Sequence, residues 1–390
     1  MAVTSSPARP HVMRAMNEQL LLEHIRSADG ISRADLARVS GLAKNTVSLA
    51  LANLERANLV RPSGVRTGVP GPAAVLYELR PDFGFVLGLD VGRQYLRAAV
   101  ADMTGGIRAR ASVRTHSTTG RARVADLVAL ADSLLDEAGI TMTQVTQTVL
   151  GSPGVYDPRR GHLWMAGALP GWESPAVLTH LWEAFGENLM IENDVDAAAL
   201  AERAHGHGRD AASFVFVSIG TGIGMGVVLD GRLHRGHHGA AGEIGFMPLD
   251  AAADERDARR RGNLDASGSA SGIVRAARQA GARNPSSAQK VFAAAAAGEP
   301  WAVRVVDDEA LLIARAVCAV VTVLDPQLVV LGGGIGQADG FVDAVGIHLR
   351  HLCPVMPELK VSALGVDAVV DGCLAAGTER AWETITAVPS

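Results

Sequence analysis

Apolar residues near the start of the chain recur with the spacing of three short helices. The first helix ends before Gly30, Ser32 is placed to cap the second, and Gly41 separates the second from the third. Two short apolar runs, at 59–61 and 74–79, follow as the strands of a wing. Helix, tight turn and second helix is the arrangement that allows the second helix to enter a DNA major groove.

Beyond Pro81 the pattern changes to buried strands that alternate with helices. Three apolar runs at 83–91, 95–101 and 107–114 predict a strand meander. The remaining elements are predicted as follows: helix 124–138, strand 145–151, a strand ending at Asn193 and Asp194, a helix that begins there and continues to 205, strand 213–219, helices 273–280, 286–297 and 301–324, strand 328–331, and a final helix at 372–384. This α/β order is typical of an actin-like or ribonuclease H-like domain, in which two lobes surround a cleft.

The pattern therefore divides the chain into three parts. We expect a winged helix-turn-helix domain at 1–80 and a small lobe at 81–192, which the C-terminal helix at 373–390 completes. The large lobe is expected at 193–372.

Composition and charge support this division. The 390 residues are 48% apolar, which is enough for several cores. Residues 1–80 carry 10 Lys/Arg against 6 Asp/Glu, whereas the remainder carries 26 against 35, so the basic end is the part expected to meet phosphate. Neither a signal peptide nor a membrane-spanning run is recognisable, which predicts a cytoplasmic protein. The three cysteines fit neither a disulfide framework nor a metal knuckle.

The third predicted helix exposes a polar face near its start. Lys can meet phosphate or guanine, and Asn can pair with adenine in the major groove. We predict DNA contacts from Arg33 of the second helix and from Lys44, Asn45, Thr46 and Ser48 of the third. Asn53 is expected to lie outside on the same helix. A three-helix module used for protein contacts is the alternative.

The stretch 191–245 combines an acidic helix start with glycine-rich loops. A strand ends in Asn193 and Asp194, a hairpin contains Gly220 to Gly226, and a later Gly-Glu-Ile-Gly motif contains Glu243. Glycines in such a hairpin leave main-chain N–H groups open to an anion or a hydroxyl. By order and spacing this stretch resembles the sugar-binding region of the ROK family. That family contains carbohydrate-responsive repressors, uncharacterised open reading frames and sugar kinases.

The resemblance runs from about Arg14 to Thr384 and implies a sugar-binding cleft. In the kinases the counterpart of Asp194 takes the proton from the attacking sugar hydroxyl, and the counterparts of Asn193 and Glu243 bind other hydroxyls. The resemblance assigns these residues to an effector pocket: Ser152, Pro153, Gly154, Asn193, Asp194, Glu243 and Asp265. Ala168 stands where the family commonly has an Asn, which removes one hydroxyl contact.

The nucleotide motif of the family is altered. Family kinases hold ATP phosphates with a hairpin of sequence Asp-x-Gly-Gly-Thr-Lys, whereas Gly92 is followed here by Arg93, Gln94 and Tyr95. We therefore expect a degenerate ATP site, with Gly220, Thr221 and Gly222 as a vestigial phosphate loop and no catalytic residues.

The metal motif is altered as well. Phe246 replaces the family's zinc-binding histidine, and the stretch 256–265 contains none of its three cysteines, so that set of ligands cannot form. We expect neither a metal nor another cofactor. Phe246 is expected to fill the former ligand space by packing.

An intact sugar pocket, a defective nucleotide site and a DNA-binding head together predict a sugar-responsive transcriptional regulator of the repressor type rather than an enzyme. Its expected partners are double-stranded operator DNA, a small carbohydrate effector and further copies of itself, as a homodimer or a dimer of dimers, with no membrane partner. One alternative is an ATP-dependent sugar kinase with a regulatory DNA-binding head, which the phosphate hairpin argues against. Another is a regulator whose pocket has lost sugar binding, which Ala168 and Phe246 favour.

Overall fold

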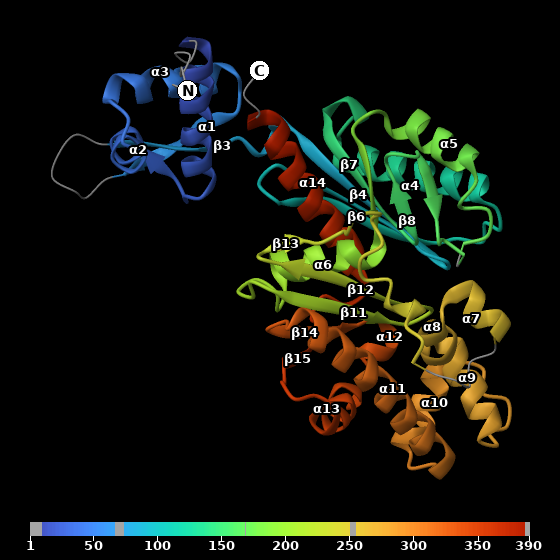
Figure 1. The fold of residues 1–390 in the computed structure, drawn as a ribbon. Helices are drawn as coiled ribbons and strands as arrows, with labels where there is room; N and C mark the ends of the chain where they lie inside the picture. Colours follow the sequence, from blue (N-terminus) through green and yellow to red (C-terminus); the bar gives the residue numbers. More distant parts are fainter. Residues whose placement is uncertain (1–9, 67–73, 168, 250–254, 387–390) are drawn as a thin grey trace, which may run out of the picture.

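The computed structural model describes residues 10–66, 74–167, 169–249 and 255–386. A small N-terminal head is joined to two α/β lobes, and the C-terminal helix runs between these parts (Figure 1). No helix within these residues is long and apolar enough to cross a membrane.

The head is a winged helix-turn-helix. It contains the helices α1 (Pro10–Arg26), α2 (Arg33–Ser40) and α3 (Lys44–Arg56), and the strands β1 (Ile31–Ser32), β2 (Val60–Arg66) and β3 (Ala74–Leu79) in the order β1-β3-β2. The Ser32 hydroxyl accepts a hydrogen bond from the Asp35 amide at 3.2 Å, which starts α2. Gly41 ends α2 in the left-handed conformation, with a φ of 69°.

The small lobe is built on a five-stranded sheet of order β10-β7-β4-β5-β6. Its strands are β4 (Phe85–Val91), β5 (Tyr95–Asp102), β6 (Ile107–Arg114), β7 (Val145–Ser152) and β10 (Leu189–Asn193), and β8 (Val155–Asp157) and β9 (His162–Trp164) form a separate pair. Because successive strand residues face opposite sides, Leu87 and Leu89 pack under α4 (Gly120–Ala138) and α5 (Pro175–Phe185), whereas Val86 packs under α14 (Ala368–Thr386).

The large lobe has a second five-stranded sheet, of order β13-β12-β11-β14-β15. Its strands are β11 (Phe214–Ile219), β12 (Ile223–Leu229), β13 (Arg232–Leu233), β14 (Leu328–Gly332) and β15 (Glu358–Val361). Helix α6 (Asp194–His205) covers one face. The other face and the outer end carry α7 (Glu255–Arg261), α8 (Asn263–Gly268), α9 (Ala270–Gln279), α10 (Ala288–Ala296), α11 (Pro300–Leu324), α12 (Gly333–Gly336) and α13 (Phe341–Leu352) (Figure 1).

Helices α4 and α14 begin earlier than the apolar pattern indicated. Helix α4 starts at Gly120 because the Thr119 hydroxyl accepts a hydrogen bond from the Ala122 amide at 3.3 Å, and α14 starts at Ala368 rather than at 372. The pattern also missed α13 and β15, whose residues lie at the edge of the large lobe.

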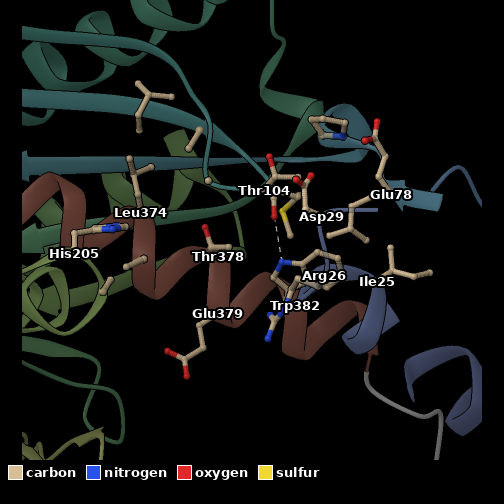
Figure 2. A pocket seen from close by; sticks show the side chains of 18 of the residues that line it. Ile25, Arg26, Asp29, Glu78, Thr104, His205, Leu374, Thr378, Glu379 and Trp382 are labelled. Atoms are coloured by element: carbon tan, nitrogen blue, oxygen red, sulfur yellow. Dashed lines mark hydrogen bonds between the residues drawn. The ribbon is translucent and has the colours of Figure 1, made fainter. Parts of the chain in front are cut away.

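Helix α14 contacts all three parts of the protein. It packs on β4, β5 and β7 of the small lobe and on α6 of the large lobe. Near its end, Trp382 meets Phe83 at a ring distance of 5.4 Å, and the Arg26 guanidinium of α1 lies 5.4 Å from the Trp382 ring. The indole of Trp382 also donates a hydrogen bond to the Met103 carbonyl at 3.2 Å (Figure 2). A cavity of about 660 Å³ lies beside this junction, between the head, the small lobe, α6 and α14 (Figure 2).

Candidate functional site

A cleft of about 1050 Å³ lies where the two lobes meet. Loops that follow strands of both lobes form its walls, as is common for ligand sites in α/β folds. Most residues predicted for the effector pocket and the vestigial phosphate loop line it: Pro153, Gly154, Asn193, Asp194, Gly220, Thr221, Gly222, Glu243 and Asp265.

Asn193 fixes the start of α6 at the floor of the cleft. Its side-chain oxygen accepts hydrogen bonds from the amides of Val195 at 2.9 Å and Asp196 at 3.1 Å, which makes it the N-cap of the helix. Its amide nitrogen donates to the Gly154 carbonyl at 3.0 Å, and this bond joins the two loops that border the cleft. Gly154 itself has a φ of 81°, a conformation that a side chain would strain.

Two acidic groups, Asp194 and Glu243, border the cleft. Asp194 is the first residue of α6, and burial raises its pKa although its own N–H and that of Val195 act in the opposite direction. Burial raises the pKa of Glu243 to about 7, and the neighbouring Asp194 and Asp265 add to the rise. A ligand that donates hydrogen bonds or carries positive charge would offset this burial of carboxylates.

Asp265 is held by the protein on the large-lobe side of the cleft. Its carboxylate accepts hydrogen bonds from the Ile223 amide at 2.7 Å and from Nε of Arg261 at 2.7 Å. A methyl group on Gly222 would come 2.9 Å from the same carboxylate, so the glycine at this position allows the hairpin to approach it. Asp265 therefore ties the glycine hairpin to α8.

Ser152 lies differently from the expectation. Its side chain is fully buried beneath the cleft loop, where it accepts a hydrogen bond from the Trp172 indole at 2.9 Å and donates to the Pro153 carbonyl at 3.0 Å. It thus supports the loop instead of lining the cleft, because a serine at the end of β7 points into the core. The predicted loss of a contact at Ala168 concerns a residue outside the described ranges.

The hairpin aligned with the kinase phosphate hairpin is closed and braced. The Gly92 amide donates to the Tyr95 carbonyl at 3.0 Å, so only Arg93 and Gln94 form the turn. Arg123, a buried residue that the sequence analysis did not single out, donates to the Gly92 carbonyl at 2.7 Å and to the Ser117 carbonyl at 2.7 Å. Arg123 and the tight turn leave Arg93 as the residue of this hairpin that lines the cleft.

Polar contacts hold the segment aligned with the family's zinc site. Arg261 donates to the Asp265 carboxylate and to the hydroxyls of Ser269 at 2.5 Å and Ser271 at 3.0 Å, and so joins α7, α8 and the start of α9. The expectation that Phe246 packs into this space is wrong, because its side chain is 44% exposed and borders the cleft. Among the described residues, no three His, Cys, Asp or Glu side chains form a group that could hold a metal ion.

A second acidic pair, Glu192 and Asp196, was not anticipated. Glu192, at the end of β10, is buried and forms an ion pair with Arg235, whose Nε lies 3.1 Å from Oε2. Asp196 lines the cleft one residue beyond Val195, and burial raises its pKa to about 8. The Asn-Asp-x-Asp sequence at 193–196 could have indicated that Asp196 lies near the cleft, because the third residue of a helix lies beside its N-cap.

The head places the predicted DNA-binding residues on one end of the helix-turn-helix. Lys44, Asn45 and Ser48 are exposed on the first turns of α3, and Thr46 is half-buried beside them. Arg33 is exposed at the start of α2 with its guanidinium 5.3 Å from the Tyr77 ring.

Asn53 departs from its expected exposed position. It is half-buried and donates to the Glu18 carboxylate at 2.6 Å, because α1 packs across the later turns of α3. Asn53 is therefore engaged within the head, whereas Lys44, Asn45 and Ser48 stay exposed at the start of α3.

A winged helix-turn-helix head on a two-lobed, actin-like domain with an acidic cleft defines the class of protein. The chain belongs to the ROK family, whose pattern matches residues 86–369, and a winged helix-turn-helix DNA-binding pattern matches residues 17–61.

Relatives of this chain include both kinases and repressors. An N-acetylmannosamine kinase from Citrobacter koseri is 34% identical over 71% of this chain and 91% of its own. The xylose repressor of Bacillus spizizenii is 25% identical over 61% of this chain and 62% of its own. The bifunctional enzyme NanE/NanK of Brucella melitensis is 40% identical over 37% of this chain, and the match spans about a quarter (27%) of that enzyme.

A solved structure resembles the whole architecture. A ROK family transcriptional regulator, described as a homologue of the E. coli MLC protein, is 25% identical with a TM-score of 0.78. The superposition covers 96% of this chain and 98% of the regulator, so the head and both lobes have counterparts there.

Proposed function

We propose that this protein is a sugar-responsive transcriptional repressor that binds operator DNA through its head and a small carbohydrate in the interlobe cleft. The observation that carries the proposal is the cleft itself, in which Asn193, Asp194 and Glu243 border an open space in a chain that also has a winged helix-turn-helix. The relatives named as a xylose repressor and a ROK transcriptional regulator support the regulatory role.

The contacts of α6 and α14 support a route between cleft and head. Asp194 starts α6, Ala197 at the end of its first turn touches Gly372 of α14, and Trp382 of α14 contacts Arg26 of the head. A sugar that contacts both walls of the cleft favours one arrangement of the lobes, and α14 carries this preference to the head. In a symmetric dimer the spacing of two heads then determines whether a palindromic operator fits.

A sugar kinase with a DNA-binding head is the second candidate. The similarity to the N-acetylmannosamine kinase and the glycine loops that line the cleft favour it. The tight Gly92–Tyr95 hairpin opposes it, because phosphoryl transfer depends on positioning the phosphates and on stabilising their charge. Sugar-dependent ADP release should therefore stay far below an ordinary kinase turnover of about 1 to 100 per second. A turnover in that range would establish the kinase.

Release from DNA by sugars tests the repressor. Purified full-length protein is bound to its own promoter region, and xylose, glucose, N-acetylmannosamine and glucose 6-phosphate are titrated in. We expect one unphosphorylated sugar to release the protein. If no sugar in a broad panel changes DNA binding, the cleft has lost its effector and the proposed function fails.

The variant Asp194→Asn tests whether the sugar acts through the cleft. The substitution keeps the shape of Asp194 but removes its charge, and a hydrogen bond to a charged group contributes about 1.5 to 3 kcal/mol. The variant should bind the operator as the wild type does but require at least roughly tenfold more sugar for release. Asp308→Asn, at an exposed position on α11, is the matched control. An unchanged response of the Asp194 variant would place the sensing site elsewhere.

A further inference from the structure

One carboxyl oxygen of Asp196, a residue that lines the cleft, has no hydrogen-bond partner among the described residues. Asp196 is 3% exposed and lines the cleft, and its main-chain amide donates a hydrogen bond to the side-chain oxygen of Asn193 at 3.1 Å. The buried Oδ1 of its carboxyl group has no hydrogen-bond partner within the described part of the chain. Buried polar atoms in folded proteins nearly always have a partner, so an unpartnered oxygen beside a ligand cleft indicates that a partner comes from outside the chain.

The neighbouring groups cannot supply that partner without giving up other contacts. Arg235 is the nearby cation, and its Nε atom lies 3.2 Å and 3.1 Å from the two carboxylate oxygens of Glu192. Asp194 and Glu243 are the other charged groups that act on Asp196, and both are acidic. The surroundings therefore offer Asp196 acceptors rather than a free donor.

The main chain at this point has little freedom to turn the carboxyl group away. The Asn193 cap holds the first turn of α6 on one side. On the other side α6 lies so close to β12 that a methyl group on Gly226 would come 2.9 Å from the Val195 carbonyl and 3.4 Å from Cα of Asp196. Asp196 is thus held at the cleft by a rigid element, which suits a recognition residue.

We propose that Asp196 is a further effector-binding residue, which accepts a hydrogen bond from a hydroxyl or amine group of the sugar. The proposal rests on the proposed function of the cleft and narrows the class of ligand. The part of the ligand beside Asp194, Asp196 and Glu243 carries hydrogen-bond donors and not a phosphate, because an anion beside three buried carboxyl groups would oppose their ionisation still further.

Binding calorimetry with two substitutions tests the assignment. Asp196→Leu keeps the branching at Cγ, although the side chain is larger, and removes the hydrogen-bonding group without leaving a buried polar atom. Asp196→Asn keeps an acceptor oxygen in the same place. The probes are xylose, glucose, N-acetylmannosamine and glucose 6-phosphate, and the comparison uses the sugar that the wild type binds most tightly.

We expect Asp196→Leu to weaken binding of that sugar at least tenfold, Asp196→Asn to stay within about threefold of the wild type, and glucose 6-phosphate to bind more weakly than glucose. Operator binding by each variant controls for folding, Asp308→Asn controls for a change of charge, and Asp196→Ala replaces the leucine variant if the latter is unstable. Equal affinities of the wild type and the folded Leu or Ala variant would overturn the assignment and leave the proposed function intact. If the wild type binds none of the sugars, the proposed function fails first and the role of Asp196 fails with it.

Discussion

Gly372 of α14 lies directly against the main chain of Ala197 in α6, so that a methyl group on Gly372 would overlap the Ala197 carbonyl oxygen. The two helices belong to different parts of the fold, since α6 covers the large-lobe sheet and α14 packs on the small-lobe sheet. Their contact is a junction of main chain with main chain, which side-chain motion cannot relax.

Gly372→Ala should therefore destabilise the protein. Inserting a methyl group into a packed interface costs about 1 to 3 kcal/mol, and here the partner is a backbone carbonyl that cannot move alone. Urea unfolding measures the change. Gly334→Ala is the matched control, because an added methyl group at that glycine meets nothing within 4 Å. Equal stability of both variants would mean that α6 and α14 are not packed so closely.

Removal of the exposed polar side chains at the start of α3 should abolish specific DNA binding. The double substitution Lys44→Ala and Asn45→Ala deletes one phosphate or guanine contact and one adenine contact, and each base contact contributes about 1 to 3 kcal/mol. Footprinting on the promoter should lose its protected region while the circular dichroism spectrum stays unchanged. The pair Gln289→Ala and Lys290→Ala, exposed on α10, supplies a control with the same types of side chain. Full protection by the α3 variant would mean that the recognition helix is misassigned.

Hydrogen bonds from Arg261, and not a bound metal ion, should stabilise the segment that contains α7, α8 and the start of α9. Arg261→Met removes the donors that join Asp265, Ser269 and Ser271, and the loss of these hydrogen bonds to partly buried acceptors should cost about 1 to 3 kcal/mol. Arg278→Met, exposed on α9, is the control. EDTA should leave the unfolding midpoint of the wild type unchanged, and elemental analysis of untagged protein should find no stoichiometric zinc. About one zinc per chain would contradict this account.

The stability of the protein should carry a pH dependence that comes from Asp196. Burial raises its pKa to about 8 in the folded protein, with Glu192, Glu243 and Asp194 adding to the rise and Arg235 opposing it. In the unfolded chain the Asp196 carboxyl group has a pKa of about 4. Between about pH 4 and 8 the folded state therefore holds one more proton than the unfolded state. Stability from this group is therefore lost as the pH rises through that window, by on the order of 1 kcal/mol per pH unit.

Asp196→Asn removes this dependence because an amide does not titrate. Relative to the wild type, the variant should gain stability from about pH 5.5 to about pH 8, and the gain should level off above that. Urea unfolding at several pH values measures the difference, and Asp308→Asn should follow the wild type because its side chain is exposed. Parallel curves for the wild type and Asp196→Asn would show that Asp196 is already ionised in the folded protein at neutral pH.

The helices of the head could be predicted from local signals in the sequence. Ser32 forms a cap with the Asp35 amide, three residues away, and Gly41 adopts the left-handed conformation that ends α2. Because such contacts span only a few residues, residue type and spacing suffice to predict them. The same holds for the strands, whose apolar runs follow from burial on one or both faces, and for the position of Asn193 and Asp194 at the start of α6.

The tertiary structure alone decided which side chains of the motifs face the cleft. Ser152 is buried under Trp172, twenty positions along the chain, while Phe246 is exposed at the cleft edge although its neighbour Ile244 is buried. Arg123 braces a hairpin thirty residues away, and Oδ1 of Asp196 has no hydrogen-bond partner within the described part of the chain while the nearby Arg235 is engaged by Glu192. These outcomes depend on contacts between segments that are far apart in the sequence. Residue type and spacing within one segment do not indicate which distant group will fill a space or engage a hydrogen-bond donor.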